Sequence, residues 1–248
     1  MHFHLPKPLH GWREFVGEIA IIVIGVLIAL AAENLIERWR WHEQADTANE
    51  AFRAELGYAA SIAYERLIIQ PCLQKQVGDL STKLSQNSGL WKASPMELHN
   101  KSYLNILPVV YRAPTRPLPT DGWKSAIASG ALNHMPSEHV RELSGIYELV
   151  GQFDAAQREE AKAASRLTPL AFNRILDDSG RTEMLAALAE VDRINSLMAL
   201  DASQIIEAVR RARFKFPLAE VEVMRRETVA AQRENRGACT AALPLDLG

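Results

Sequence analysis

The sequence predicts an all-α protein, in which an N-terminal single transmembrane helix continues into a long helix and is followed by an antiparallel helical-bundle domain. Two observations predict this class. Apolar residues recur at steps of three and four through most of the chain, which is the period of one helix face. No segment alternates apolar and polar residues convincingly with the period of two that is typical of strands. The 248 residues suffice for an anchor and one sizeable domain or two small ones.

The anchor is predicted from an apolar run and from the tryptophans around it. Residues 19–32 carry no polar side chain, but fourteen helical residues reach only roughly 21 Å, less than the ~30 Å hydrocarbon layer. Trp12 precedes the run, and Trp39 and Trp41 follow it, as expected for indoles at the two headgroup levels. Trp12 and Trp39 are about 40 Å of helix apart, which matches a whole bilayer. We therefore predict a transmembrane helix over residues 12–36.

One side of this helix has the composition of a packing face for a second transmembrane helix. Small side chains four residues apart let another helix approach closely, and polar groups then pair across the contact. The second helix would come from another copy of the chain or from a partner membrane protein. The alternative is that both glutamates lie at the headgroups of a helix that only anchors. At 100° per residue, the residues that share this side are Glu18, Ile22, Gly25, Ala29, Ala32 and Glu33.

A cleavable signal peptide is the competing interpretation of the same run. The run has signal-peptide length, and residues 29–31, Ala-Leu-Ala, resemble a cleavage site. However, the region before it is long and carries Glu14 and Glu18, and the helical pattern continues through the site. We therefore favour an uncleaved anchor. Basic residues are balanced on its two sides, so the short N-terminus and the large C-terminal domain predict a cytoplasmic N-terminus and an extracytoplasmic domain.

Two segments resemble an uncharacterised group of bacterial single-pass membrane proteins. The first is residues 11–19, Gly-Trp-Arg-Glu-Phe-Val-Gly-Glu-Ile, followed by residues 24–30, Ile-Gly-Val-Leu-Ile-Ala-Leu. The second, residues 123–132, is similar to a segment in the soluble part of that group. The resemblance is good over roughly thirty residues and loose elsewhere. It implies a bacterial inner-membrane protein that keeps the Gly17-Glu18 pair in its anchor, and it implies no activity. In such a protein, the extracytoplasmic domain predicted above would lie in the periplasm.

Composition and cysteine content limit the other interpretations. A net charge of −2 argues against a nucleic-acid partner. The densest basic run, residues 210–215, lies at a predicted helix end, where cations favour the helix dipole and could also meet anionic lipid. Cys72 and Cys239 have no metal-type spacing. Outside the cytoplasm they could form a disulfide, and two independent free thiols are the alternative.

Turn signals and helical periodicity divide the chain into six parts. A face from Ala45 to Leu67 continues the anchor as a long helix, which we expect Pro71 to end near Gln70. Ser94 starts a further short helix, with Pro95 at its first position. The predicted parts are a cytoplasmic tail (1–11), the transmembrane helix (12–36), a long helix with short helices (37–107), a proline-rich loop (108–120), the bundle (121–236) and a C-terminal tail (237–248).

The bundle segment contains a short helix that ends near Gly130, a helix that starts at Pro136 and a last helix from Pro217 to about Asn235. The strongest pattern steps by four and three without a break, as in a bundle helix, and its Asn195 could fix the register. This seam consists of Met184, Leu188, Val191, Asn195, Met198, Ala202, Ile205 and Val209.

The sequence contains no recognisable catalytic or cofactor-binding constellation. His2, His4 and His10 lie in a tail that offers no organised metal site, and no histidine pair has the i, i+4 spacing of helical ligands. We interpret the acid pairs Glu159-Glu160 and Asp177-Asp178 as solvated. Trp123 and Tyr147 are interpreted as core aromatics, with a ligand-stacking role as the alternative.

Three functions remain at this stage. The first is a non-enzymatic, membrane-anchored helical protein that binds a protein partner, as an accessory or assembly subunit of a membrane complex. The second is a periplasmic sensor-type domain that binds a small ligand between its helices. The third, an enzyme acting on envelope material, is the weakest. We expect no cofactor, no metal and no nucleic-acid partner.

Overall fold

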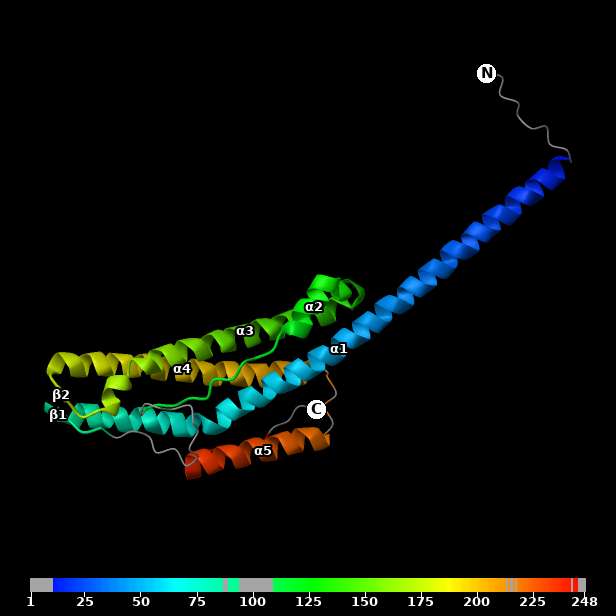
Figure 1. The fold of residues 1–248 in the computed structure, drawn as a ribbon. Coiled ribbons are helices and arrows are strands. Elements are labelled where there is room, and N and C mark those ends of the chain that lie inside the picture. Colours follow the sequence, from blue (N-terminus) through cyan, green and yellow to red (C-terminus); the bar gives the residue numbers. More distant parts are fainter. Residues whose placement is uncertain are drawn as a thin grey trace, which may run out of the picture.

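The computed structural model describes residues 11–86, 89–93, 109–212, 214, 216, 218–241 and 243–244. The all-α class is confirmed. Figure 1 shows one long helix whose N-terminal half projects alone, while its C-terminal half packs with the other helices. The helices are α1 (Trp12–Gln86), α2 (Asp121–Ser129), α3 (Ser137–Ser165), α4 (Asp178–Arg211) and α5 (Leu218–Arg236), with 3-10 turns η1 (Ala131–His134), η2 (Thr168–Ala171) and η3 (Gly237–Cys239).

Helices α3 and α4 form the bundle together with the C-terminal half of α1. Helix α5 packs on α1 from another side (Figure 1). Side chains of Asn49 and Glu55 on α1 contact His139 and Tyr147 on α3, so these two helices run in the same direction. Helix α4 runs antiparallel to both, because Arg181 near its start donates to the Leu84 carbonyl near the end of α1. The helical seam predicted in α4 is confirmed, since all eight of its residues are buried.

Helix α1 does not end at Pro71, so that prediction is wrong. The helix continues to Gln86 with Pro71 inside it, and Figure 1 shows a change of direction in its middle part. Proline lacks an N–H and crowds the preceding turn, which frees carbonyl groups there. The Ile68 carbonyl accepts a hydrogen bond from the Ala241 N–H at 2.7 Å. Burial of Leu73, Val77 and Leu84 against the bundle stabilises the helix beyond the proline.

Glycine residues and the proline-rich segment shape the connections before and after α2. Gly130 adopts a left-handed conformation, φ 77°, and caps the C-terminus of α2, which confirms that α2 ends there. Gly122 allows a close approach, because a Cβ at this position would lie 2.9 Å from the Ala51 Cβ on α1. The described part of the proline-rich segment, residues 109–120, contains no helix or strand, as predicted. There, the Gln157 side chain pairs with both the N–H and the carbonyl of Arg116.

Two strands of three residues each were not expected. β1 (Gly89–Trp91) pairs antiparallel with β2 (Arg174–Leu176) at the end of the bundle farthest from the projecting helix (Figure 1). The Trp91 indole is buried and donates to the Leu170 carbonyl at 2.8 Å, which fixes this end of the fold. The helix start predicted at Ser94 lies outside the described residues, and so does Pro217. Helix α5 begins at Leu218 and ends one residue after the predicted Asn235.

Candidate functional site: the projecting helix and its junction with the bundle

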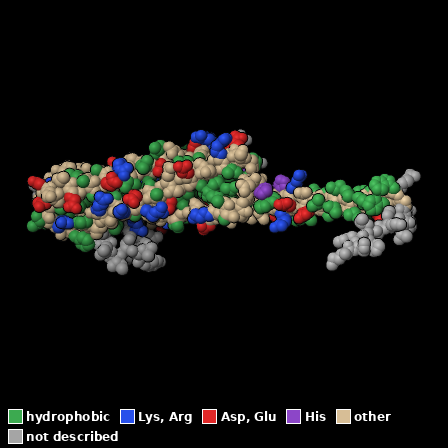
Figure 2. All heavy atoms as spheres, turned by 90° about the horizontal axis from the view of Figure 1, so that it is seen from above, with side chains coloured by type: hydrophobic (Ala, Val, Ile, Leu, Met, Phe, Trp, Pro, Cys, Tyr) green, Lys and Arg blue, Asp and Glu red, His purple; other side chains and the backbone are tan. Residues whose placement is uncertain are grey.

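The N-terminal half of α1 exposes a continuous apolar surface. Ile21 and Ile28 expose 73% and 64% of their surface, and Figure 2 shows hydrophobic side chains gathered on the visible face of the projecting helix, away from the bundle. Within the described residues, this is the one helix long and apolar enough to cross a membrane. In water, so large an apolar surface on a monomer is unfavourable and marks a site of membrane or protein contact.

The residues of the predicted packing face all lie on this projecting half. They are exposed, and a Cβ at Gly25 would meet no atom within 4 Å. Close approach of a second helix at Gly25 and Ala29 is therefore sterically open. The packing face formed by Glu18, Ile22, Gly25, Ala29, Ala32 and Glu33 stays a prediction.

The three predicted interface tryptophans are placed differently from one another. Trp12 and Trp39 point into open space and expose 77% and 69% of their surface. Trp41 is half-buried, because its ring stacks on His134 of η1 with the ring centroids 3.8 Å apart. Trp41 therefore belongs to the junction between the projecting helix and the bundle as well as to the predicted interface set.

One carboxylate on α1 organises the junction. The Glu55 carboxylate accepts hydrogen bonds from the Gly122 N–H at 2.7 Å and from the Tyr147 hydroxyl at 2.7 Å. It also accepts a longer one, 3.4 Å, from the backbone N–H of Trp123. It thereby satisfies free N–H groups in the first turn of α2, where a negative charge is favoured. Burial, together with the hydrogen bond and charge of Glu55, raises the pKa of Tyr147 and keeps its hydroxyl a donor.

The aromatic rings at the junction fill the space between the helices. Trp123 stacks on Tyr147 with centroids 4.7 Å apart, and Phe52 packs edge-on against both rings. This agrees with their interpretation as core aromatics. The sensor hypothesis, which would place a ligand beside Trp123 and Tyr147, stays a prediction.

The C-terminal tail is fastened along α1 by three contacts. A disulfide joins Cys72 to Cys239, with the Cα atoms 5.0 Å apart. The Ala241 N–H donates to the Ile68 carbonyl, and the Tyr64 hydroxyl donates to the Leu243 carbonyl at 2.6 Å. Contacts two residues apart in the tail thus meet residues four apart in α1. We call Cys239–Ala241 together with Leu243 the C-terminal strap.

A buried polar network crosses the middle of the bundle. The Arg66 guanidinium donates to both carboxylate oxygens of Glu160, at 2.7 and 2.8 Å, and to the Asn195 side chain at 2.7 Å. Tyr111 donates to Glu160 at 2.6 Å, and all four side chains are at least nine-tenths buried. The prediction that Glu159-Glu160 is a solvated pair is therefore wrong for Glu160. Glu159 is exposed, as expected.

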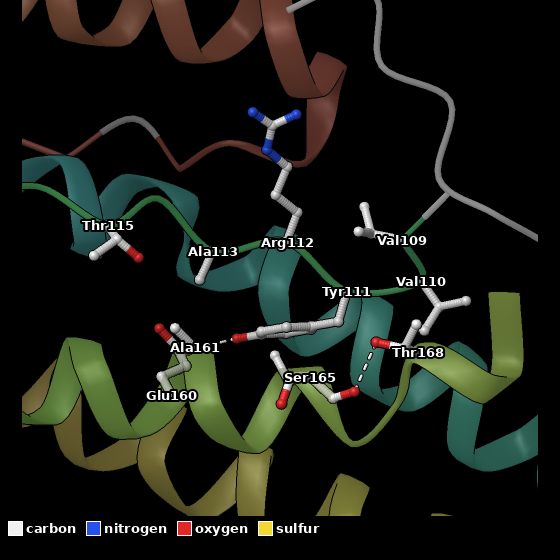
Figure 3. Close-up of a pocket in the computed structure, with 11 residues that line it drawn as sticks. Val109, Val110, Tyr111, Arg112, Ala113, Thr115, Glu160, Ala161, Ser165 and Thr168 are labelled. Carbon is white, nitrogen blue, oxygen red and sulfur yellow. Dashed lines mark hydrogen bonds between the residues drawn. The ribbon is translucent and has the colours of Figure 1, made fainter. Parts of the chain in front are cut away.

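The network adjoins a pocket of about 290 Å³ between residues 109–115 and α3. Figure 3 shows the Tyr111 hydroxyl directed at Glu160, while the Arg112 side chain points away from it. Burial and the Glu160 carboxylate raise the pKa of Tyr111, so its hydroxyl stays protonated at neutral pH. Glu160 is itself occupied by Arg66. In the pocket, these two groups therefore act as a fixed hydrogen-bonded pair rather than as a free acid and base.

Other candidate residues give no organised chemistry. Among the described residues, no group of three or more His, Cys, Asp or Glu side chains could hold a metal ion. His2, His4, His10 and His99 lie outside them. In the basic run, Arg210 and Arg211 both pair with Glu207 and lower its pKa, while Arg213 and Lys215 are not among the described residues.

No known protein family, curated protein or solved structure matches this chain. The features that bear on function are therefore the chain's own: the exposed half of α1, the junction at Glu55 and the strap.

Proposed function

We propose that this protein is a non-enzymatic, single-pass membrane protein whose helical bundle is held at the bilayer surface and whose transmembrane helix binds a partner. We infer a cytoplasmic N-terminus and a periplasmic bundle at a bacterial inner membrane. The observation that carries the proposal is the continuity of α1, a single helix of 75 residues that is exposed and apolar in its first half and packed in its second.

Continuity of the helix also supports an uncleaved anchor. Cleavage after residue 31 would leave α1 beginning at Ala32 and would remove most of its exposed apolar residues, which the bundle does not bury. An unbroken helix instead holds the bundle at a fixed position relative to the apolar half of α1.

The Cys72–Cys239 pair supports the orientation. Disulfides persist in oxidising compartments such as the periplasm and are rare in the cytosol. Both cysteines lie on the C-terminal side of the apolar half of α1. In a periplasmic bundle, the disulfide would therefore stay oxidised and keep the strap attached to α1.

Fractionation tests the anchor and its orientation together. We expect the full-length protein to stay in the membrane after carbonate extraction. We also expect that protease added to spheroplasts cleaves the bundle. Recovery of soluble protein that begins at Ala32 would overturn the proposal. Protection of the bundle from protease would overturn the orientation.

The partner contact is tested by a double substitution, Gly25→Leu with Ala29→Leu. Larger side chains should prevent close helix approach and reduce association, measured by crosslinking and by co-purification in mild detergent with mass spectrometry. The matched control is Ala20→Leu with Ala31→Leu, which enlarges two small, exposed side chains on the opposite side of the helix and should leave association unchanged. Equal association of both variants and the wild type would remove this face from the proposal.

A further inference from the structure

We propose that the turn formed by the end of α2 and η1, residues 127–134, is a second membrane contact that rests in the phospholipid headgroup layer. We call this turn the foot. The inference rests on the proposed function, because it uses the position of the bilayer on α1.

The foot points toward the membrane end of the molecule. The start of α2 is fixed at Glu55 through the Gly122 N–H, and η1 is fixed at Trp41 through His134. From Gly122 to His134 the chain therefore descends along α1 by 14 positions, about 21 Å. Helix α3 then ascends again, and its His139 contacts Asn49 at 3.1 Å.

The height of the foot follows from the rise of a helix. Exposed apolar side chains continue to Leu35 and Ile36, which we take as the end of the hydrocarbon layer. Trp41 lies six residues beyond Leu35, or about 9 Å. A headgroup region is about 5–7 Å thick on each side of the hydrocarbon layer. When α1 is upright, the foot therefore begins about 2–4 Å beyond the outer edge of the headgroups.

Tilt brings the foot into that layer. Membrane helices tilt by about 20° on average. A group about 10 Å to the side of the helix axis then moves by about 3 Å toward the membrane when the tilt is in its direction. The junction is fixed by the Trp41–His134 stack and by Glu55, so the foot follows the tilt of α1 rather than moving independently.

The side chains of the foot suit a headgroup layer. Ile127 exposes 56% of its surface, while Asn133 and His134 are exposed polar groups that can meet phosphate and glycerol oxygens. Figure 2 shows histidine side chains where the projecting helix meets the bundle. Trp41, which stacks on His134, is of a type enriched at this depth, and the imidazole likewise has an apolar body and a polar tip.

Photo-crosslinking in liposomes tests the inference with the full-length protein. p-Benzoylphenylalanine is placed at one position at a time: Ile28 in the apolar half of α1, Asn133 in the foot, or Ile175 in β2. Ile175 is 78% exposed and lies at the opposite end of the bundle, so it serves as the control. We expect phospholipid adducts, detected by mass spectrometry, at Ile28 and Asn133, with at least tenfold less at Ile175.

An insertion variant distinguishes crosslinking that depends on the height of the foot above the bilayer from nonspecific adsorption of lipid. Seven helix-forming residues inserted after Trp39 keep the helical phase within about 20° and lift the bundle by about 10 Å, without altering contacts inside the bundle. Adducts at Asn133 should then fall at least tenfold, while those at Ile28 remain.

The outcomes distinguish the two proposals. Adducts at Ile28 without adducts at Asn133 would overturn the foot alone, and so would adducts at Asn133 that survive the insertion. Adducts at Ile175 equal to those at Asn133 would mean that the bundle lies flat, which also overturns it. The absence of adducts at Ile28 would instead overturn the membrane anchor.

Discussion

The two halves of α1 carry similar aliphatic side chains in opposite surroundings. Leu27 and Ile28 in the first half expose 59% and 64% of their surface, whereas Phe52 and Leu56 in the second half are fully buried. The difference lies in the pattern around the helix. In the first half, residues 19–32 are apolar on all sides, while the second half is apolar on one side and polar on the other. A helix that is apolar all round needs a nonpolar surrounding, and one with a single apolar face needs only a bundle.

Charged side chains show the same contrast. Arg38, which follows the apolar run in the first half, is exposed, whereas Arg66 in the second half is buried and held by Glu160 and Asn195. A buried charge is tolerated only when it is paired and hydrogen-bonded. The side chains in the second half of α1 are therefore stabilised by specific partner residues, whereas those in the first half require a suitable surrounding medium.

The sharpest test of this contrast deletes one large side chain from each half. Phe52→Ala leaves a cavity at the junction and should lower the free energy of unfolding of the bundle by about 3–5 kcal/mol. Leu27→Ala should leave that free energy unchanged, because the Leu27 side chain lies in the projecting half. Both are measured by denaturant unfolding in detergent micelles, with near-ultraviolet circular dichroism as the probe. A bundle equally sensitive to the two variants would contradict the division of α1.

The second test compares the two arginines. Arg66→Met leaves the Glu160 carboxylate buried without its cation and should cost about 3–5 kcal/mol. The matched control, Arg38→Met, should cost less than about 0.5 kcal/mol, as is usual for exposed positions. The double variant Arg66→Met with Glu160→Leu removes both charges and should recover most of the loss. If it recovers none, the network stabilises the bundle by more than charge pairing.

Local patterns were sufficient to predict most of this architecture. The α4 seam, the stop at Gly130 and the start of α3 all depend on residues near one another in the sequence, and the structure has them where they were expected. The prediction at Pro71 failed because the helix there is held by distant residues. Its Ile68 carbonyl is satisfied by Ala241, and no short window of sequence contains that pairing.

The buried network was missed for a related reason. Arg66 lies on the apolar face of α1, three residues after Ala63, and Glu160 lies seven after Phe153 on the seam of α3. A charged residue at a seam position on each of two helices was a signal for a buried pair. Sequence alone could not match the two, because their pairing depends on α1 and α3 running in the same direction.

The strap gives a third and intermediate test. Replacing both cysteines, Cys72→Ser with Cys239→Ser, should lower the free energy of unfolding by about 2–5 kcal/mol. Amide exchange should rise first in α5, because the disulfide at Cys239 ties the chain just after α5 to α1. Reductant should bring the wild type down to the level of the double variant and leave the variant unchanged. A wild type that does not respond to reductant would show that the strap is held without the disulfide.

The smallest expected effect concerns Asp201, an acidic residue largely buried on α4. Burial raises its pKa, so the folded state binds the proton more tightly than the unfolded state does. The charged carboxylate therefore lowers stability at neutral pH, and this penalty disappears as the pH falls below the ordinary aspartate pKa, where both states are protonated. Asp201→Asn should raise the free energy of unfolding at pH 7 by less than about 1 kcal/mol and leave it unchanged near pH 3. The exposed Asp192→Asn on the same helix is the control. A gain for Asp201→Asn that stays constant from pH 3 to pH 7 would assign the effect to packing rather than to charge.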